Sequence, residues 1–318
     1  MFHCWSSAHY TLPLPAGHRF PIEKYALLRD AVLAEGIVPR ERMHDPERAT
    51  REELLRVHTA GYVDRLGEGR LTEAEIRRLG FPWSPQLVER SYRAVGGTLG
   101  ATRAALRHGV AMNLAGGTHH AFPDHGEGFC VFNDVAVAVR ALLDAGEIAR
   151  AAVVDLDVHQ GNGTHAIFAG EERVHTFSMH GERNYPYRES APVGDASDPR
   201  RYGVRVPGTR DVDLPEGVGD DEYLAVLAAE LPAVLAAARP DLVVYLGGAD
   251  PHEGDRLGRM RLTFDGLARR DTLVLESCRE VGIPVAITIA GGYGRDIRDT
   301  VRIHTTTARI ARKFATSP

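Results

Sequence analysis

The chain of 318 residues is long enough to bury the core of one large α/β domain, and its 43% hydrophobic and 25% charged residues are ordinary for a globular protein. A net charge of −5 gives no reason to expect a nucleic-acid partner. The sequence contains no apolar run of about 18 residues, so no membrane span is predicted. Three cysteines without a pairing pattern, and a first segment without a signal-peptide pattern, favour a reducing, cytoplasmic location.

Lysine usage excludes two further classes of enzyme. Of the 38 lysines and arginines, only two are lysines, Lys24 and Lys313. Neither stands in the Gly-x-x-x-x-Gly-Lys motif of a P-loop nucleotidase, and neither follows a strand that could present a pyridoxal-binding lysine. The chain also lacks the Gly-x-Ser-x-Gly motif of serine hydrolases.

Apolar runs and helix-forming segments alternate along the chain, which predicts a single α/β domain over residues 1–318. In chain order we expect helix 86–108, strand 110–115, helix 135–143 opening at Asn133-Asp134, strand 152–159, strand 174–177, helix 223–238, strand 242–246, helix 264–281 and strand 285–290. The strands are almost continuously apolar, so they predict a mostly parallel sheet covered by helices on both faces.

Three details of these elements carry expectations. Gly96, Gly97 and Gly100 should weaken or interrupt the first helix, where they favour close packing over phosphate binding. Pro232 should kink or divide helix 223–238. Residues 181–210 are rich in Arg, Pro, Gly and Asp and are expected to form a long surface excursion near the functional site.

All five strands end in small and polar residues. The strand from Ala152 ends in Asp155, Asp157 and His159 at alternate positions, which would place these side chains on one face of an extended strand. The other four run into Gly116-Gly117-Thr118-His119-His120, Ser178-Met179-His180, Gly247-Gly248-Ala249-Asp250 and Gly291-Gly292-Tyr293-Gly294. Because the carboxyl ends of parallel strands meet at one edge, these groups predict a single site there.

The residues at this edge suit metal-assisted hydrolysis of an amide or ester. Asp157, His159 and Asp250 would give three ligands to a divalent metal and leave one position open. His119 and His120 can supply a base for the attacking water. They could instead be ligands, but Asp157 and Asp250 would then be surplus.

Two further groups could take part at this edge. Tyr293, after two glycines, could donate a hydrogen bond to the developing oxyanion. Cys130 could be a nucleophile, although a small apolar residue beneath the site is the better interpretation, because nothing in the sequence activates it.

These motifs together resemble the zinc-dependent histone deacetylase superfamily, most closely the bacterial relatives of the class IV enzymes. The resemblance rests on Gly116–Ala121, Gly128–Asp134, Asp155–Gly163, Gly248–Asp255 and Gly291–Tyr293, and segment Leu14–Tyr25 also suits the family. Asn184-Tyr185-Pro186, Asp211–Pro215 and the chain length point to the class IV relatives. The resemblance spans nearly the whole chain and implies an arginase-like α/β fold.

The resemblance also implies a role for each site residue. Zinc would be bound by Asp157, His159 and Asp250, although iron or cobalt could replace it. His120 would be the general base with Asn162 behind it, His119 its companion oriented by Asp155, and Tyr293 the group that polarises the carbonyl. The acyl-lysine stem would lie between Phe129 and Tyr185, with Gly128 and Leu257 nearby. A structural potassium ion would use Asp155, Asp157 and Ser178.

Two residues depart from the family pattern. Gln160 stands where a second histidine is commoner, and it is expected to lie outside the metal site. Asn162 replaces an aspartate found in some classes, so the pair it forms with His120 should carry less charge.

Three hypotheses follow, and a deacylase leads them. Its substrate would be an acyl-lysine protein or peptide, or an acylated small amine such as an acetylated polyamine. An arginase-type enzyme would need more carboxylates for two metals, and Gln160 and Asn162 occupy the positions beyond His159. A non-catalytic acyl-lysine binder would be favoured if the histidine pair or Tyr293 were missing. The sequence leaves the oligomeric state open.

Overall fold

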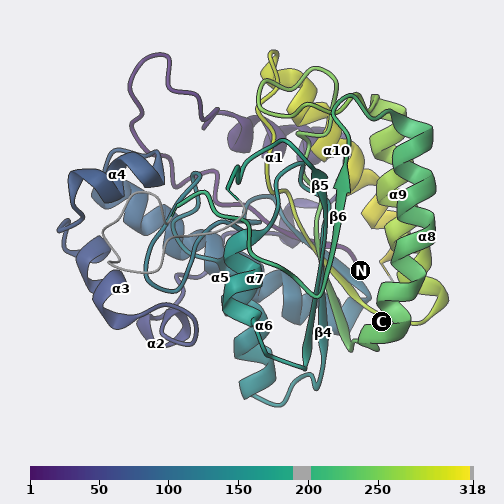
Figure 1. Ribbon diagram of the computed structural model, residues 1–318, viewed down its shortest axis with the longest axis horizontal. Coiled ribbons are helices and arrows are strands. Elements are labelled where there is room, and N and C mark those ends of the chain that lie inside the picture. The colour runs from purple at the N-terminus through teal and green to yellow at the C-terminus, as the bar shows by residue number, and fades with distance from the viewer. Residues whose placement is uncertain (189–201, 316–318) are drawn as a thin grey trace.

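The computed structural model describes residues 1–188 and 202–315 (Figure 1). Its strands form one sheet in the order β2-β1-β3-β8-β7-β4-β5-β6, and every neighbouring pair is parallel. The strands are β1 (His3–Trp5), β2 (Met43–His44), β3 (Val110–Asn113), β4 (Ala151–Asp155), β5 (Val174–Gly181), β6 (Arg210–Leu214), β7 (Leu242–Leu246) and β8 (Val285–Thr288). The predicted α/β class and parallel sheet are therefore confirmed.

Helices lie on both faces of this sheet, with α8, α9 and α10 on one side and α5, α6 and α7 on the other (Figure 1). Their bounds are α1 (Lys24–Ala34), α2 (Arg51–Leu54), α3 (Ala60–Gly67), α4 (Glu73–Leu79), α5 (Pro85–His108), α6 (Asp134–Asp144), α7 (Asn162–Phe168), α8 (Asp220–Ala238), α9 (Phe264–Glu280) and α10 (Ile297–Phe314), with a 3-10 turn at Arg40–Arg42. None of these described helices is long and apolar enough to cross a membrane.

The central strands show why the apolar runs are continuous. Along β4, Ala152 and Val154 join one apolar cluster, whereas Ala151 and Val153 join another. The same alternation occurs along β7 and β8. Each strand therefore buries both of its faces, which leaves the strand ends as the place for polar groups. On this basis we propose that the described residues form one domain.

Helix α5 is continuous over 24 residues, so the expected interruption at its glycines is wrong. The packing interpretation is correct: a Cβ atom at Gly96 would lie 1.8 Å from the Glu47 carbonyl oxygen, and one at Gly100 would lie 2.5 Å from Trp5 Nε1. Burial against neighbouring chain therefore outweighs the weak helix propensity of glycine.

Two other expectations need correction or restriction. Pro232 does not divide its helix, because α8 runs without a break from Asp220 to Ala238. Pro232 is on the exposed side, where water can bond to the backbone carbonyl that proline leaves free. Of the predicted surface excursion, residues 189–201 lie outside the described ranges.

Candidate active site

Strand β4 ends at Asp155, so the prediction that Asp155, Asp157 and His159 share the face of one extended strand is wrong. The chain instead bends after Asp155. The backbone N–H of Asp157 donates to Asp155 Oδ1 at 3.1 Å, and that of His159 donates to Asp157 Oδ1 at 3.0 Å. Each aspartate thus turns the backbone two residues ahead of it, as Asp side chains commonly do in turns. These bends still bring Asp157 and His159 to the sheet edge.

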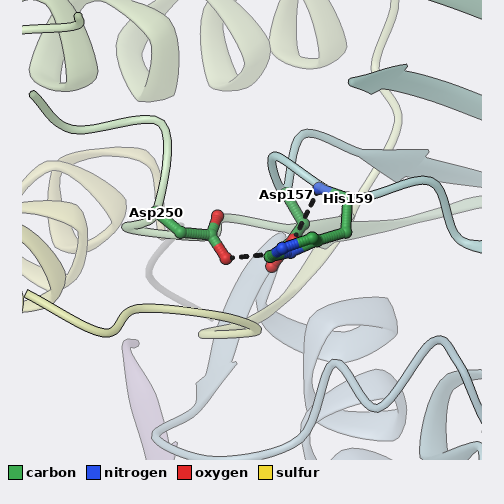
Figure 2. Close-up of side chains that lie close together, drawn as sticks. All are labelled: Asp157, His159 and Asp250. Atoms are coloured by element: carbon green, nitrogen blue, oxygen red, sulfur yellow. Dashed lines mark hydrogen bonds and ion pairs between the residues drawn. The ribbon is translucent and has the colours of Figure 1, made fainter. Parts of the chain in front are cut away.

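Asp250 reaches the same point from the loop after β7, and the three side chains converge (Figure 2). The potential ligand atoms of Asp157, His159 and Asp250 all lie within 4.8 Å of one another. His159 Nδ1 is 2.8 Å from Asp157 Oδ1 and 3.4 Å from Asp250 Oδ2. All three residues are buried. They form the candidate metal site that the sequence predicted.

The donor set of this site fits a divalent cation. Asp250 Oδ2 is buried and makes no hydrogen bond among the described residues beyond the ion-pair contact with His159 Nδ1 at 3.4 Å, an arrangement that is costly unless a cation compensates it. Burial, and then the nearby Asp157 carboxylate, raise the pKa of Asp250, which shows that the two acids repel each other. Two carboxylates and one imidazole match the ligands zinc uses in catalytic sites.

The loops around the site leave no space for larger residues. The Gly291 N–H donates to Asp157 Oδ2 at 2.7 Å, and a Cβ atom at Gly291 would lie 1.9 Å from Asp250 Oδ2. Only glycine allows the loop after β8 to approach both carboxylates this closely.

Arg270, which sequence reasoning missed, holds two of these loops together. This fully buried residue of α9 donates from Nη1 to Gly248 O at 2.7 Å and lies 3.4 Å from Leu156 O. The two carbonyls belong to the loops that carry Asp250 and Asp157. The sequence did contain a signal for this role, because Arg270 falls on the inward, apolar face of a predicted amphipathic helix.

The histidine pair lies on the loop after β3, and Asp134 holds this loop in place. The Asp134 carboxylate accepts the backbone N–H groups of Gly117 at 3.1 Å and Thr118 at 2.8 Å. Asn133 caps α6 through the Ala136 N–H at 3.0 Å, as its position before the helix predicted. The start of α6 therefore fixes the position of His119 and His120.

The two imidazoles have different partners. His119 Nδ1 lies 2.7 Å from Asp155 Oδ2, and His120 Nδ1 lies 2.7 Å from Asn162 Oδ1, which is the pairing that the resemblance implied. Burial lowers the pKa of His119, but the Asp155 and Asp157 carboxylates outweigh it and raise the pKa to about 9. Burial, followed by the neighbouring His119 and His159, holds the pKa of His120 well below its usual value. His120 is therefore the neutral imidazole of the pair.

Tyr293 is held at the edge of the site by its backbone. Its N–H donates to Asp255 Oδ2 at 2.6 Å, while its hydroxyl makes no hydrogen bond with the part of the chain that the structure describes. Burial, and then the Asp157 carboxylate, raise the pKa of the phenol well above its usual value. The hydroxyl therefore keeps its proton and remains free to donate it to a ligand.

Beside this tyrosine lies Lys24, to which the sequence assigned no role. This buried lysine donates from Nζ to Gly292 O at 3.2 Å, and Nζ lies 5.4 Å from the centre of the Tyr293 ring. The ammonium group thus supports the Gly-Gly turn that presents the tyrosine.

A cavity of about 350 Å³ connects these groups. It is lined by the predicted site residues His119, His120, Asp157, His159 and Tyr293 and by all four predicted wall residues, Gly128, Phe129, Tyr185 and Leu257. The Tyr185 ring stands edge-on to His120 at 4.8 Å between centroids, and the Phe129 ring is 5.9 Å from that of Tyr293. Apolar walls with a few converging polar groups are typical of ligand sites.

Cys130 also lines this cavity but does not suit a nucleophile. Its thiol is buried, with Sγ 3.6 Å from Gly128 O, and burial raises its pKa well above the usual value. The thiolate, which is the reactive form, is therefore disfavoured. This agrees with the interpretation of Cys130 as a small residue beneath the site.

Two remaining sequence predictions concern residues outside the metal cluster. Gln160 donates to Asp211 Oδ1 at 3.0 Å and accepts the Val206 N–H at 3.1 Å, so its side chain is used away from the metal site, as expected. Asp155 and Ser178 are register partners on β4 and β5, but Ser178 Oγ lies 2.9 Å from His180 Nδ1. Nothing in the described residues supports the potassium ion, which stays a prediction.

Known proteins are similar to this chain in sequence and architecture. Residues 18–308 match the sequence profile of the histone deacetylase domain. An uncharacterized protein of Picosynechococcus is 45% identical over 303 residues, covering 95% of this chain and 96% of its own. The histone deacetylase-like amidohydrolase of Pseudomonas aeruginosa is 30% identical over 290 residues, 88% of this chain and 74% of its own. The structure of a histone deacetylase homolog from Aquifex aeolicus superimposes with a TM-score of 0.81 and 25% identity over 98% of this chain and 84% of that one.

Proposed function

This chain belongs to the histone deacetylase family, and on that premise we propose that it is a zinc-dependent amidohydrolase that removes acetyl or longer acyl groups from N-acyl-lysine or a similar acylated amine. One observation carries the proposal. A neutral imidazole, a buried phenol and two of the three candidate metal ligands line the same cavity, and the third ligand, Asp250, lies within 4.8 Å of the other two. These are the groups that hydrolysis of an unactivated amide requires.

A zinc ion bound by Asp157, His159 and Asp250 would supply a Lewis acid for the amide carbonyl and make a water more acidic. His120 would act as the base. Its Nδ1 lies against the Asn162 carbonyl oxygen, an acceptor, so Nδ1 carries the hydrogen and Nε2 offers its lone pair. Nε2 can then take a proton from the attacking water and return it to the leaving amine.

His119 and Tyr293 would stabilise charge beside that proton transfer. The Asp155 carboxylate, 2.7 Å from His119 Nδ1, would favour the cationic form of His119. The Tyr293 hydroxyl would donate a hydrogen bond to the oxyanion that forms as water attacks the carbonyl. Phe129 and Tyr185 would hold the aliphatic stem of the acylated amine, with Gly128 and Leu257 completing the walls.

The alternative hypotheses find less support. Among the described cavity residues the one carboxylate is the ligand Asp157, which leaves no anionic partner for the ammonium groups of an acetylated polyamine. Within residues 1–188 and 202–315, one cluster of three candidate ligands occurs, whereas an arginase-type centre needs more carboxylates for a second metal. A non-catalytic binder would have no use for the base and the phenol in the cavity.

A deacylation screen tests the proposal. Protein reconstituted with Zn²⁺, Fe²⁺ or Co²⁺ would be incubated with acetyl-, butyryl- and octanoyl-lysine peptides and with acetylated polyamines, and released amine would be measured. We expect turnover of at least one acyl-lysine peptide, abolished by a chelator and restored by metal. His120→Ala protein purified identically controls for contaminating deacetylases. Activity on none of the acylated amines would contradict the proposal, and activity on polyamines alone would favour the alternative substrate.

A further inference from the structure

A buried carboxylate that lies outside the family motifs is connected to His120 through one intervening side chain. Glu127 is fully buried at the start of the turn that carries Gly128 and Phe129. Its Oε1 accepts a hydrogen bond from Asn162 Nδ2 at 2.8 Å. Asn162 Oδ1 in turn lies 2.7 Å from His120 Nδ1. A continuous hydrogen-bonded path therefore runs from Glu127 to the histidine.

The same carboxylate oxygen also contacts the cavity wall. The Tyr185 hydroxyl donates to Glu127 Oε1 at 2.6 Å, and on the other oxygen the Gly203 N–H lies at 3.3 Å and His125 Nε2 at 3.7 Å. Burial raises the pKa of Glu127, but its interactions with His125, Tyr185 and Asn162 outweigh it and lower the pKa. Glu127 is therefore ionised, and an ionised carboxylate can only accept hydrogen bonds.

This restriction determines how Asn162 is oriented. Because Glu127 Oε1 and the Val204 carbonyl oxygen, at 3.0 Å, are both acceptors, Asn162 must point its NH₂ group toward them. Its carbonyl oxygen must then face His120, which requires the hydrogen of that imidazole to be on Nδ1. The lone pair of Nε2 is consequently left for the cavity. If the amide of Asn162 were reversed, it would stabilise the opposite, unproductive tautomer.

We propose that Glu127 is a positioning residue for the reaction: through Asn162 it fixes the tautomer of His120 and supplies the negative charge that the asparagine lacks. The inference rests on the proposed function of His120 as the base. In some classes of the family an aspartate at the position of Asn162 would contact the histidine directly. Here the carboxylate is Glu127, which lies one hydrogen bond farther from His120, behind Asn162. The charge that forms on His120 as it accepts a proton is stabilised through the amide of Asn162.

Exchanging the two side chains tests the inference. Glu127→Gln should lower kcat about 10- to 100-fold with KM changed less, because the buried charge is lost. Asn162→Asp alone should also lower kcat, since two carboxylate oxygens would meet at a distance now spanned by a hydrogen bond. The double variant, which carries both substitutions, moves the charge next to His120 and provides an amide donor at position 127 for the new carboxylate at position 162. The Val204 carbonyl oxygen would then face the new carboxylate, so the double variant should recover only part of the kcat lost in Glu127→Gln, but its kcat should exceed the value expected if the two single losses multiplied.

Two results would overturn the inference: near-normal kcat in Glu127→Gln, or a double variant whose losses simply multiply. A structural role for Glu127 predicts the second result. If Asn162→Asp folds poorly, Asn162→Ala serves instead, because Glu127→Gln should then cause no further loss of kcat. Metal content is measured for every variant. Glu171→Gln is the control, since Glu171 pairs with Arg173 at 2.8 Å away from the cavity and its loss should leave kcat unchanged.

Failure of the inference can be distinguished from failure of the proposed function. The deacylation screen is run on the wild-type protein first, so a missing activity appears before any variant is made. The free energy of unfolding of Glu127→Gln, Asn162→Ala and the variant that combines these two substitutions is then measured in urea, which needs no substrate. Non-additive losses of stability are expected for directly bonded partners, and additive losses would contradict the hydrogen-bonded path.

Discussion

The active site consists of two halves that are built differently. The metal half, Asp157, His159 and Asp250, is held by backbone groups: the N–H groups of residues 158, 159 and 291 all donate to its carboxylates. The base half, His119 and His120 with Asp155, Asn162 and Glu127, is held by bonds between side chains from loops far apart in the sequence. Metal binding and proton transfer should therefore respond separately to mutation.

Removing a ligand should have the largest effect. Asp250→Ala should leave a folded protein that retains little metal and no measurable turnover, because three ligands hold the ion. Metal content is measured by elemental analysis after gel filtration. Asp255→Ala is the matched control: Asp255 belongs to the same loop and bonds to the Tyr293 N–H, outside the ligand cluster, so it should keep its metal. Full metal occupancy in Asp250→Ala would disprove the assignment of this ligand.

Removing the base should leave the metal half intact. His120→Ala should lose about 10²- to 10⁴-fold in kcat, the usual contribution of a general base, and keep its zinc. Turnover and metal content are measured on the same sample. If this variant lost its metal, the histidine would be a ligand and the division into two halves would be wrong.

Tyr293 should matter for turnover more than for binding. Tyr293→Phe keeps the ring and should lower kcat about 10²- to 10³-fold, as the loss of an oxyanion donor does. Binding of a zinc-chelating hydroxamate should change little, which calorimetry can measure. Tyr62→Phe provides a control, because Tyr62 does not line the cavity and its hydroxyl is already used in a bond to Val131 O at 2.7 Å. Near-normal turnover of Tyr293→Phe on a verified substrate would refute the role.

Acid should weaken the chain segment that supports the base half. His58 is buried; its Nδ1 lies 3.0 Å from Phe122 O, and its Nε2 accepts the Asn133 N–H at 3.0 Å. The bond at Nε2 requires the neutral ring, because a protonated Nε2 has no lone pair to accept the Asn133 N–H. Burial is the main cause that lowers the pKa of His58 from 6.5 to about 4. Since the folded-state pKa lies below the unfolded one, stability is full above pH 6.5 and falls toward pH 4, by about 3 kcal/mol in total.

Urea unfolding of the metal-free protein between pH 7 and pH 4.5 measures this effect without a contribution from metal release. His58→Gln cannot titrate at this position, so its stability should depend less steeply on pH than that of the wild type. Parallel pH profiles of the two proteins would show that His58 is not responsible.

Much of the metal half could be predicted from the sequence, because its ligands follow apolar strands directly and glycines mark the tight loops. The same apolar pattern wrongly extended strand β4 through Asp157 and His159. The hydrogen bonds that bend the chain after Asp155 depend on side-chain rotamers, which the sequence does not show. Helix α10 was missed although it is strongly amphipathic, because β-branched residues such as Thr300, Thr305 and Thr307 lower its helix propensity.

The base half was predictable in part. The roles of His119, His120, Asp155 and Asn162 came from the resemblance, and the structure brings each histidine to its expected partner. Glu127 had no signal, because its partners Asn162 and Tyr185 are 35 and 58 residues away and a single glutamate has no spacing to interpret. Arg270 differs from Glu127, because its place on the inward face of an amphipathic helix was a signal, but its partners, backbone carbonyls on other elements, could not be identified from the sequence.

The hydrogen bond from the Gly291 N–H to Asp157 Oδ2 connects metal occupancy to the segment that presents Tyr293. An ion on Asp157 fixes the carboxylate that this amide needs, so bound metal and an ordered 291–293 segment should stabilise each other reciprocally. Amide hydrogen exchange can detect this linkage: chelation should speed exchange at Gly291 more than at Leu156, whose N–H donates to Leu246 O at the end of β7 and not to a ligand carboxylate. The oxyanion donor would then be in place only in protein that already holds its metal.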